Sequence, residues 1–310
     1  MKNSICDTRL ANCTQWYLIP PPDIKMRIPD AVKKCVVFIG IKKPSESFDQ
    51  IKYIGTGFFV SIPAVKIPDC SFPYLVTAKH VAVEIGEKDF FIRANSKDGG
   101  MTFFKGSKNF KWWFHPDPIW PSDVAVFPMT IPPKTFKTVD YSTIHAATLL
   151  TDEERMSEGI GEGDEVATVG LFSHHTGSEK NIPIIRMGNI AMISDEPIRT
   201  AKFGNMEAYL IEMRSIGGLS GSPVFVLKPV ELGRWKIHLL GLIHGHWDVP
   251  DNQIIDATVE DAGIKAGVNV GIAMVIPAKK ILETLNCKEL ADNRAKIEAK
   301  EIAKNSPTPD

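Results

Sequence analysis

The sequence predicts an all-β protein whose strands fall into two groups, followed by a helix near the carboxyl terminus. About twelve short runs of β-branched and aromatic residues alternate with glycine, proline and charged segments. No sustained helical period interrupts the first of the two groups. The chain has 23 glycines and 22 prolines among 310 residues, which suits many turns better than a helical bundle. Paired β-barrels or a β-sandwich are therefore the favoured architectures.

The first group of strands is expected within residues 34–150. It follows residues 1–33, a polar stretch interrupted by prolines that is predicted to be an irregular extension. The expected strands are residues 36–42, 55–62, 74–83, 90–94, 101–105, 111–115 and 123–129. The strand pattern lapses over residues 130–163, which we interpret as a connector. Within it, Thr151 precedes an acidic run and is predicted to cap one or two helical turns.

The second group of strands is expected within residues 151–290. Its strands are residues 164–172, 184–194, 207–214, 222–228, 235–246 and 268–276. Pro277 then precedes residues 278–286, whose apolar side chains recur at helical spacing, so that an amphipathic helix is predicted there. Residues 291–310 form a charged tail that is expected to extend the helix and then fray.

Composition and charge exclude several classes of protein. A hydrophobic fraction of 44%, a charged fraction of 24% and a net charge of -1 are typical of a soluble globular chain. They predict no attraction to nucleic acid or to a membrane surface. No stretch resembles a secretory signal or a membrane span, so we expect a cytoplasmic protein. The cysteines show no spacing typical of disulfide or metal frameworks and are expected to be thiols: Cys6, Cys13, Cys35, Cys70 and Cys287.

Three local motifs place a histidine, an aspartate and a serine at the expected ends of strands. YLVTAKHV (74–81) ends a predicted strand with His80, and PSDVAVF (121–127) opens another with Asp123. GGLSGSPVF (217–225) is a glycine-rich turn that carries Ser220 ahead of a third strand. Histidine, aspartate and serine in this order form one of the chain orders found in hydrolase triads.

These residue types supply what acyl transfer requires. The serine hydroxyl is a weak nucleophile that needs a neighbouring base, and an imidazole with a pKa of about 6.5 suits that task. A carboxylate on the far ring nitrogen fixes the tautomer and stabilises the imidazolium. Preorganised N–H donors must stabilise the developing oxyanion. The glycines around Ser220 permit such a turn, and the backbone amides of Gly218 and Ser220 are the candidate donors.

Each motif also has a plain structural interpretation. A lone histidine in a strand is usually structural, an aspartate after Pro-Ser is usually a turn-former, and a G-x-S-G stretch is often just a turn. Only the combination of the three motifs favours catalysis. The remaining isolated histidines are expected to be structural or exposed: His115, His145, His174, His175 and His238.

Because these motifs occur in the family's order, the sequence resembles the chymotrypsin-fold serine peptidases over roughly residues 33–285. It is most similar to bacterial trypsin-like members such as glutamyl endopeptidases and high-temperature-requirement proteases. The matching segments are GTGFFV (55–60), LVTAKHV (75–81), SDVAVF (122–127), GDEVATVG (163–170), GGLSGSPVF (217–225), LGLIHGH (240–246) and GIAMVIP (271–277).

This resemblance implies two six-stranded antiparallel β-barrels with the catalytic triad in the cleft between them. His80 and Asp123 would come from the first barrel and Ser220 from the second. The implied activity is a serine endopeptidase that acts on proteins or peptides without a cofactor or metal. The resemblance does not specify an oligomeric state.

The chain departs from the family at positions next to the motifs. Animal digestive members carry an aspartate directly before the serine, where it pairs with a new amino terminus; this chain has Leu219, so that activation is not expected. Val81 stands where disulfide-bonded members have a cysteine, and Lys79 stands where a small residue is usual.

The resemblance also suggests a substrate preference. It places the floor of the primary specificity pocket at Arg214, and His244 and Gly245 on the strand that forms the pocket wall. An arginine and a histidine facing one pocket would attract a carboxylate, so we hypothesise cleavage after Glu, Asp or Gln. Alternatively, Arg214 points away and pairs with an acid such as Glu212. The string His244, His246 and Asp248 has metal-ligand types, but the sequence shows no fourth ligand.

Two other functions remain open. One is a noncatalytic or latent scaffold of the same fold that binds peptides in its cleft. The other is a triad esterase on an unrelated fold, in which a G-x-S-x-G serine would lead into a helix and the histidine would come last. Here Ser220 is followed by residues that lead into a predicted strand, and His80 comes first, which favours the peptidase.

Overall fold

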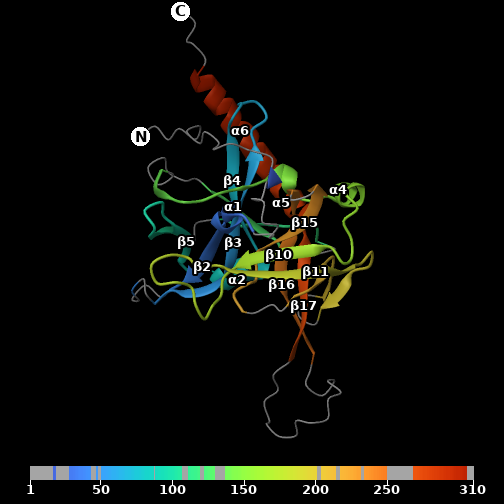
Figure 1. The fold of residues 1–310 in the computed structure, drawn as a ribbon. Helices are drawn as coiled ribbons and strands as arrows, with labels where there is room; N and C mark the ends of the chain where they lie inside the picture. Colours follow the sequence, from blue (N-terminus) through green and yellow to red (C-terminus); the bar gives the residue numbers. More distant parts are fainter. Residues whose placement is uncertain are drawn as a thin grey trace, which may run out of the picture.

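The computed structural model shows two groups of antiparallel strands packed side by side, with helices at the carboxyl end of the chain (Figure 1). None of the described helices is both long enough and apolar enough to cross a lipid bilayer. The structure describes residues 17–18, 28–42, 47, 50–86, 88–106, 111–118, 122–129, 137–200, 204–213, 217–231, 234–249 and 268–305.

Strands from the second half of the chain close into a six-stranded barrel. The order around it is β16-β15-β10-β11-β14-β17, and β17 pairs back with β16. Closure leaves no free edge around the ring, which is a stable way to finish an antiparallel sheet. The second predicted barrel is therefore confirmed. Its strands are β10 (Glu165–Gly170), β11 (Ile184–Ile193), β14 (Tyr209–Glu212), β15 (Pro223–Glu231), β16 (Arg234–Val249) and β17 (Val268–Pro277).

Strands from the first half form one sheet with the order β6-β5-β2-β3-β4-β8-β7, and β9 pairs in parallel with β3. Among the described strands this path has two ends, so a first closed barrel is not shown. The expectation of two closed six-stranded barrels is thus met in one half only. The strands are β2 (Val36–Ile41), β3 (Lys52–Pro63), β4 (Ser71–Thr77), β5 (Phe90–Asn95), β6 (Met101–Gly106), β7 (Trp113–Phe114), β8 (Ala125–Pro128) and β9 (Ile144–His145).

Several helices agree with the sequence pattern. Thr151 caps α4 (Asp152–Ser157) through a reciprocal capping box with Glu154. The helix predicted after Pro277 is α5 (Ala278–Leu285), and the charged tail continues as α6 (Lys288–Asn305). The expected connector over residues 130–163 thus contains α4, β9 and the short 3-10 helix η2 (Ala146–Thr148), while residues 130–136 lie outside the described part.

Other elements correct the sequence-based expectations. The strand expected over residues 74–83 ends at Thr77, and the chain then turns into α2 (Lys79–Ile85). Val81, Ala82 and Ile85 are buried at helical spacing, so the period of the buried positions changes from that of a strand to that of a helix. The region 1–33, expected to be irregular, contains β1 (Tyr17–Leu18) and the start of α1 (Asp30–Lys34). The hairpin β12 (Ile198–Thr200) and β13 (Gly204–Met206) was not expected.

One large hydrophobic core joins the two halves. It contains buried residues of the first sheet, such as Phe58 and Leu75, together with barrel residues such as Val169, Phe225 and Leu242. A separate cluster that includes Val224 and Ile243 fills the barrel itself. Because the larger cluster draws on both halves, hydrophobic burial holds them in one fixed arrangement.

Helix α6 packs against the hairpin between β3 and β4, so that the carboxyl-terminal segment is tied to the first half (Figure 1). The Glu298 carboxylate is 3% exposed and accepts hydrogen bonds from the amides of Val65, at 2.7 Å, and Lys66, at 3.3 Å. The Arg294 guanidinium donates to the hydroxyl of Tyr74 and to the carbonyl of Leu285. These contacts explain why a charged sequence forms an ordered helix here.

Replacement of Glu298 by alanine should lower the free energy of unfolding by about 1–2 kcal/mol, because two amides lose their acceptor. Urea denaturation followed by circular dichroism measures this change. Lys300→Ala, an exposed position on the same helix, is the matched control and should change stability by no more than about 0.5 kcal/mol. Equal stabilities for the two variants would contradict this account of how α6 is anchored.

Candidate active site

His80 lies in the first turn of helix α2, where backbone amides have no intrahelical partner. Its own amide donates to Oδ1 of Asp123 at 2.8 Å, and its ring Nδ1 lies 2.7 Å from Oδ2 of the same carboxylate. The carboxylate thus satisfies a free helix amide and binds the imidazole at once. An anion at a helix amino terminus is also favoured electrostatically. This double contact fixes both the backbone and the ring of His80.

Asp123 reaches His80 because the strands next to the two residues are neighbours in the sheet. Strand β4 pairs with β8, so that Thr77 lies opposite Ala125, and the Lys79 amide donates to the Asp123 carbonyl at 3.2 Å. The Asp123 residue is 5% exposed. Lys79, which stands where a small residue is usual in the family that the sequence resembles, directs its ammonium group over the ring of Phe114, 5.3 Å from the centroid.

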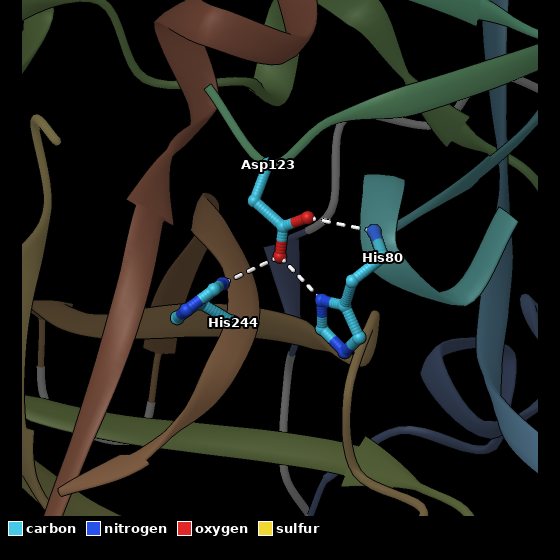
Figure 2. A group of neighbouring side chains, drawn as sticks. All are labelled: His80, Asp123 and His244. Carbon is cyan, nitrogen blue, oxygen red and sulfur yellow. Dashed lines mark hydrogen bonds and ion pairs between the residues drawn. The ribbon is translucent and has the colours of Figure 1, made fainter. Parts of the chain in front are cut away.

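A second imidazole binds the same carboxylate oxygen from the other half of the molecule. Nδ1 of His244, on β16, lies 2.5 Å from Oδ2 of Asp123, and the His244 side chain is 4% exposed (Figure 2). The rings of His80 and His244 meet edge to face with centroids 5.5 Å apart. Sequence reasoning missed this contact and expected His244 in a substrate pocket.

His244 lies in a β-bulge of strand β16. In the pairing of β16 with β17, Ile243 lies opposite Val275 and Gly245 opposite Met274, so that His244 is the extra residue. Bulges redirect side chains and are common beside functional sites. The bulge follows from pairing between distant segments, and the local sequence gives no signal for it.

The hydrogen bonds determine the ionisation of the site. Burial raises the pKa of Asp123, but the hydrogen bonds from His244 and His80, together with their positive charges, outweigh burial and lower it from 3.8 to about 2. Asp123 is therefore a carboxylate at neutral pH and can only accept hydrogen bonds. Both imidazoles must then carry a proton on Nδ1. In neutral His80 this leaves Nε2, which points away from Asp123 in Figure 2, as the ring atom that can accept a proton.

Ser220 lies on the glycine-rich loop at the start of β15, next to these groups. Its hydroxyl donates a hydrogen bond to the backbone carbonyl of His244 at 3.3 Å. Ser220 thus contacts the backbone of His244, whose side chain contacts Asp123. Gly218 and Gly221 have φ of 96° and 81°, the left-handed region that favours glycine. A Cβ on Gly221 would collide with the carbonyl of Thr56 and the hydroxyl of Thr77, which explains the need for glycine there.

The other predicted site residues lie at several places in the chain. In the described part of the chain, the amides of Gly218 and Ser220 have no hydrogen-bond acceptor, as a candidate oxyanion hole requires. Gly245 lies on β16 beside the bulge, opposite Met274. Arg214 lies outside the described residues. His244, which was expected on the wall of the specificity pocket, turns Nδ1 towards Asp123, and its side chain is buried.

His80, Asp123 and His244 also form a group whose ligand atoms lie within 4.8 Å of one another, which is close enough to consider a metal ion. The separations of 2.5 Å and 2.7 Å are those of charge-assisted hydrogen bonds. A zinc ion bound at about 2.0–2.2 Å from each ligand atom would need the three groups to move apart. Shared protons therefore account for this geometry better than a metal ion does.

Comparison with known proteins gives distant structural matches. No protein family model matches the chain. No curated protein matches its sequence. Among solved structures, the apo protease domain of MamO from Magnetospirillum magneticum matches with a TM-score of 0.49 and 14% identity, covering 83% of this chain and 98% of that one. Deg5 matches with a TM-score of 0.44 and 14% identity, over 82% of this chain and 88% of the other. Both are too distant to transfer the role of any residue.

The lowered pKa of Asp123 predicts acid-dependent stability that involves His244. As the pH falls from about 4 to about 2, the unfolded carboxyl binds a proton before the folded one, so up to about 2 kcal/mol of stability is lost. His244→Leu removes one stabilising hydrogen bond and should raise the pKa of Asp123 towards its usual value. This variant should be less stable at pH 6 and lose less stability between pH 4 and pH 2.

Urea denaturation at a series of pH values measures this effect. His244→Asn, whose side-chain amide nitrogen is as many bonds from Cβ as Nδ1 of histidine, is the matched control and should retain more of the acid dependence than His244→Leu. Comparison of the two variants cancels the contributions of other carboxylates. Parallel pH profiles for wild type and His244→Leu would show that His244 does not stabilise the Asp123 carboxylate.

Proposed function

We propose that this protein is a serine endopeptidase that cleaves peptide bonds through an acyl-enzyme on Ser220. The observation that carries the proposal is the double hydrogen bond from His80 to the buried, ionised carboxylate of Asp123. This arrangement holds an imidazole in the tautomer whose Nε2 is a base. It lies beside a glycine-rich loop that carries a serine hydroxyl and two amides without acceptors in the described part of the chain.

In the proposed reaction, Nε2 of His80 takes the proton of the Ser220 hydroxyl as the oxygen attacks the substrate carbonyl. The carbonyl oxygen becomes an oxyanion, which the amides of Gly218 and Ser220 stabilise by hydrogen bonds. Asp123 stabilises the imidazolium through Nδ1 and keeps its own charge. The imidazolium then protonates the leaving amine. His80 then takes a proton from a water molecule as its oxygen attacks the acyl carbon, and returns that proton to the Ser220 oxygen as the ester bond breaks.

Ser220→Ala should abolish labelling by a fluorophosphonate probe and lower peptide hydrolysis by on the order of 10⁴-fold or more, because the nucleophile is lost. His80→Ala should have a similar effect. Asp123→Asn should lower kcat by on the order of 10⁴-fold, because the amide favours the wrong tautomer of His80. Asp98→Asn, on an exposed turn, is the matched control and should behave as wild type.

A noncatalytic or latent peptide-binding scaffold is the second candidate. One observation favours it: the Ser220 hydroxyl donates a hydrogen bond to the His244 carbonyl. Catalysis would require that hydroxyl to turn and donate to His80. Catalytic hydrogen bonds are often loose before substrate binds, so the peptidase remains the preferred proposal. Folded wild-type protein that takes up no probe would instead support the scaffold.

For the peptidase we propose a preference for Glu, Asp or Gln before the scissile bond. The proposal rests on the positive charge of Arg214, which attracts carboxylates, and on the resemblance that places Arg214 at the floor of the primary specificity pocket. A panel of peptides that differ only at this position tests it, and the three acidic or amide variants should be cleaved fastest. Equal kcat/KM values for Phe, Lys and Glu peptides would refute the preference without affecting the proposed reaction.

A further inference from the structure

Thr56, on β3 of the first half, holds the Ser220 loop of the second half through several hydrogen bonds. Its side chain is completely buried. The Thr56 hydroxyl donates to the carbonyl of Gly218 at 2.8 Å and accepts from the amide of Leu171 at 2.8 Å. The Thr56 amide donates to the carbonyl of Ser220 at 2.9 Å. Two carbonyls of the loop, one on each side of Leu219, are therefore fixed by one residue.

Ser173 holds the next peptide group back along the same loop. Its hydroxyl donates to the carbonyl of Gly217 at 3.1 Å. Ser173 follows Leu171 closely in the chain, so the bond from the Leu171 amide to Thr56 also positions the segment that carries Ser173. The hydroxyls of Thr56 and Ser173 thus act on neighbouring carbonyls, and we refer to them together as the hydroxyl latch.

The geometry of a peptide group links the carbonyls of Gly217 and Leu219 to the candidate oxyanion donors, which are the amides of Gly218 and Ser220. In a trans peptide the C=O and N–H bonds point in opposite directions. The bond from Ser173 to the Gly217 carbonyl therefore fixes the direction of the Gly218 amide. The bond from Thr56 to the Gly218 carbonyl holds the next peptide group, whose amide belongs to Leu219, so that Ser173 and Thr56 restrain the backbone on both sides of the Gly218 Cα. In the same way, the carbonyl of Leu219 accepts from the amide of Ser222 at 2.9 Å, which fixes the direction of the Ser220 amide. Rotation of either peptide group would break a hydrogen bond.

The first part of the loop needs such restraint because it consists of two glycines. Gly217 and Gly218 lack a Cβ, so that a rotation of the peptide between them meets small steric resistance. Leu219 is completely buried in the core of the barrel, and this burial anchors the part of the loop that follows Gly218. Hydrogen bonds from outside the loop are therefore the restraints that can hold the Gly218 amide towards the substrate.

We propose that the hydroxyl latch of Thr56 and Ser173 positions the oxyanion hole by holding the carbonyls of Gly218 and Gly217. This inference rests on the proposed peptidase function, since it assigns a role in the stabilisation of the oxyanion. Thr56 and Ser173 touch neither substrate nor reacting atoms and act through the loop, so they are positioning residues. A preorganised donor is worth much more than one that must rotate into place during the reaction.

The rate of fluorophosphonate labelling and the steady-state hydrolysis of a peptide test the proposal in the full-length protein. Thr56→Val has a similar shape but no hydroxyl and should lower kcat by about 10²-fold with KM little changed. Thr56→Ser keeps the hydroxyl and should restore most of the rate. Ser173→Ala should lower kcat by about fivefold, the effect of one modest neutral hydrogen bond.

Controls separate positioning from general damage. Ser173 is exposed, so Ser173→Ala should fold normally even if Thr56→Val does not. Ser178→Ala, at another exposed position in the same segment, should match wild type. The pH midpoint of kcat/KM should stay the same in all variants, because the contact between His80 and Asp123 is untouched. Wild-type kcat in both Ser173→Ala and folded Thr56→Val would overturn the latch.

The two levels of the proposal fail in different ways. If folded wild-type protein is neither labelled nor active, the proposed peptidase function is wrong, and the hydroxyl latch has no role in stabilising an oxyanion. Hydrogen exchange of the segment 217–222 then tests whether the hydroxyls hold the loop at all. Faster exchange in Thr56→Val, reversed in Thr56→Ser, would support the structural part, and unchanged exchange would refute it.

Discussion

The buried carboxylate of Asp123 accepts three hydrogen bonds, two from His80 and one from His244. An ionised carboxyl away from water is costly unless such donors replace its hydration. One donor residue belongs to helix α2 of the first half and the other to strand β16 of the barrel. The carboxylate is therefore stabilised only when the two halves are packed together, and the geometry of the candidate site depends on that packing. The same bonds keep Asp123 ionised, which allows it to orient an imidazole.

The Ser220 loop depends on the same contact between the halves. Pairing within the closed barrel fixes β15 and β16, but the loop before β15 is held by Thr56 of the first half. The large hydrophobic core that spans both halves keeps β3 and the loop in register. The candidate base, the carboxylate, the serine hydroxyl and the candidate oxyanion donors thus gather where the two halves pack together, on elements fixed by burial and hydrogen bonds. This is the kind of support that precise catalytic geometry requires.

Much of this arrangement could be predicted from local sequence pattern. Most strands, the Thr151 cap and the helix after Pro277 follow from alternation, capping and turn residues. The proximity of His80 and Asp123 was expected from a known order of motifs, and the two side chains are hydrogen-bonded in the structure. Helix α2 was missed because a short apolar run after Thr77 fits a strand as well as a helix. The contact of His244 with Asp123 depends on a bulge and on packing between distant halves, which no local pattern encodes. Likewise, the expectation that the first sheet closes into a barrel came from the family resemblance and not from the residues of its strands.

The protonation of the two imidazoles tests the central interaction most directly. Long-range ¹H–¹⁵N NMR of the histidine side chains at pH 8 should show His80 and His244 both protonated on Nδ1, with these protons shifted downfield by the Asp123 carboxylate. In Asp123→Asn, both signals should move upfield. An Nε2-protonated tautomer for His80 in the wild-type protein, or signals that do not respond to the loss of the carboxylate, would contradict the account.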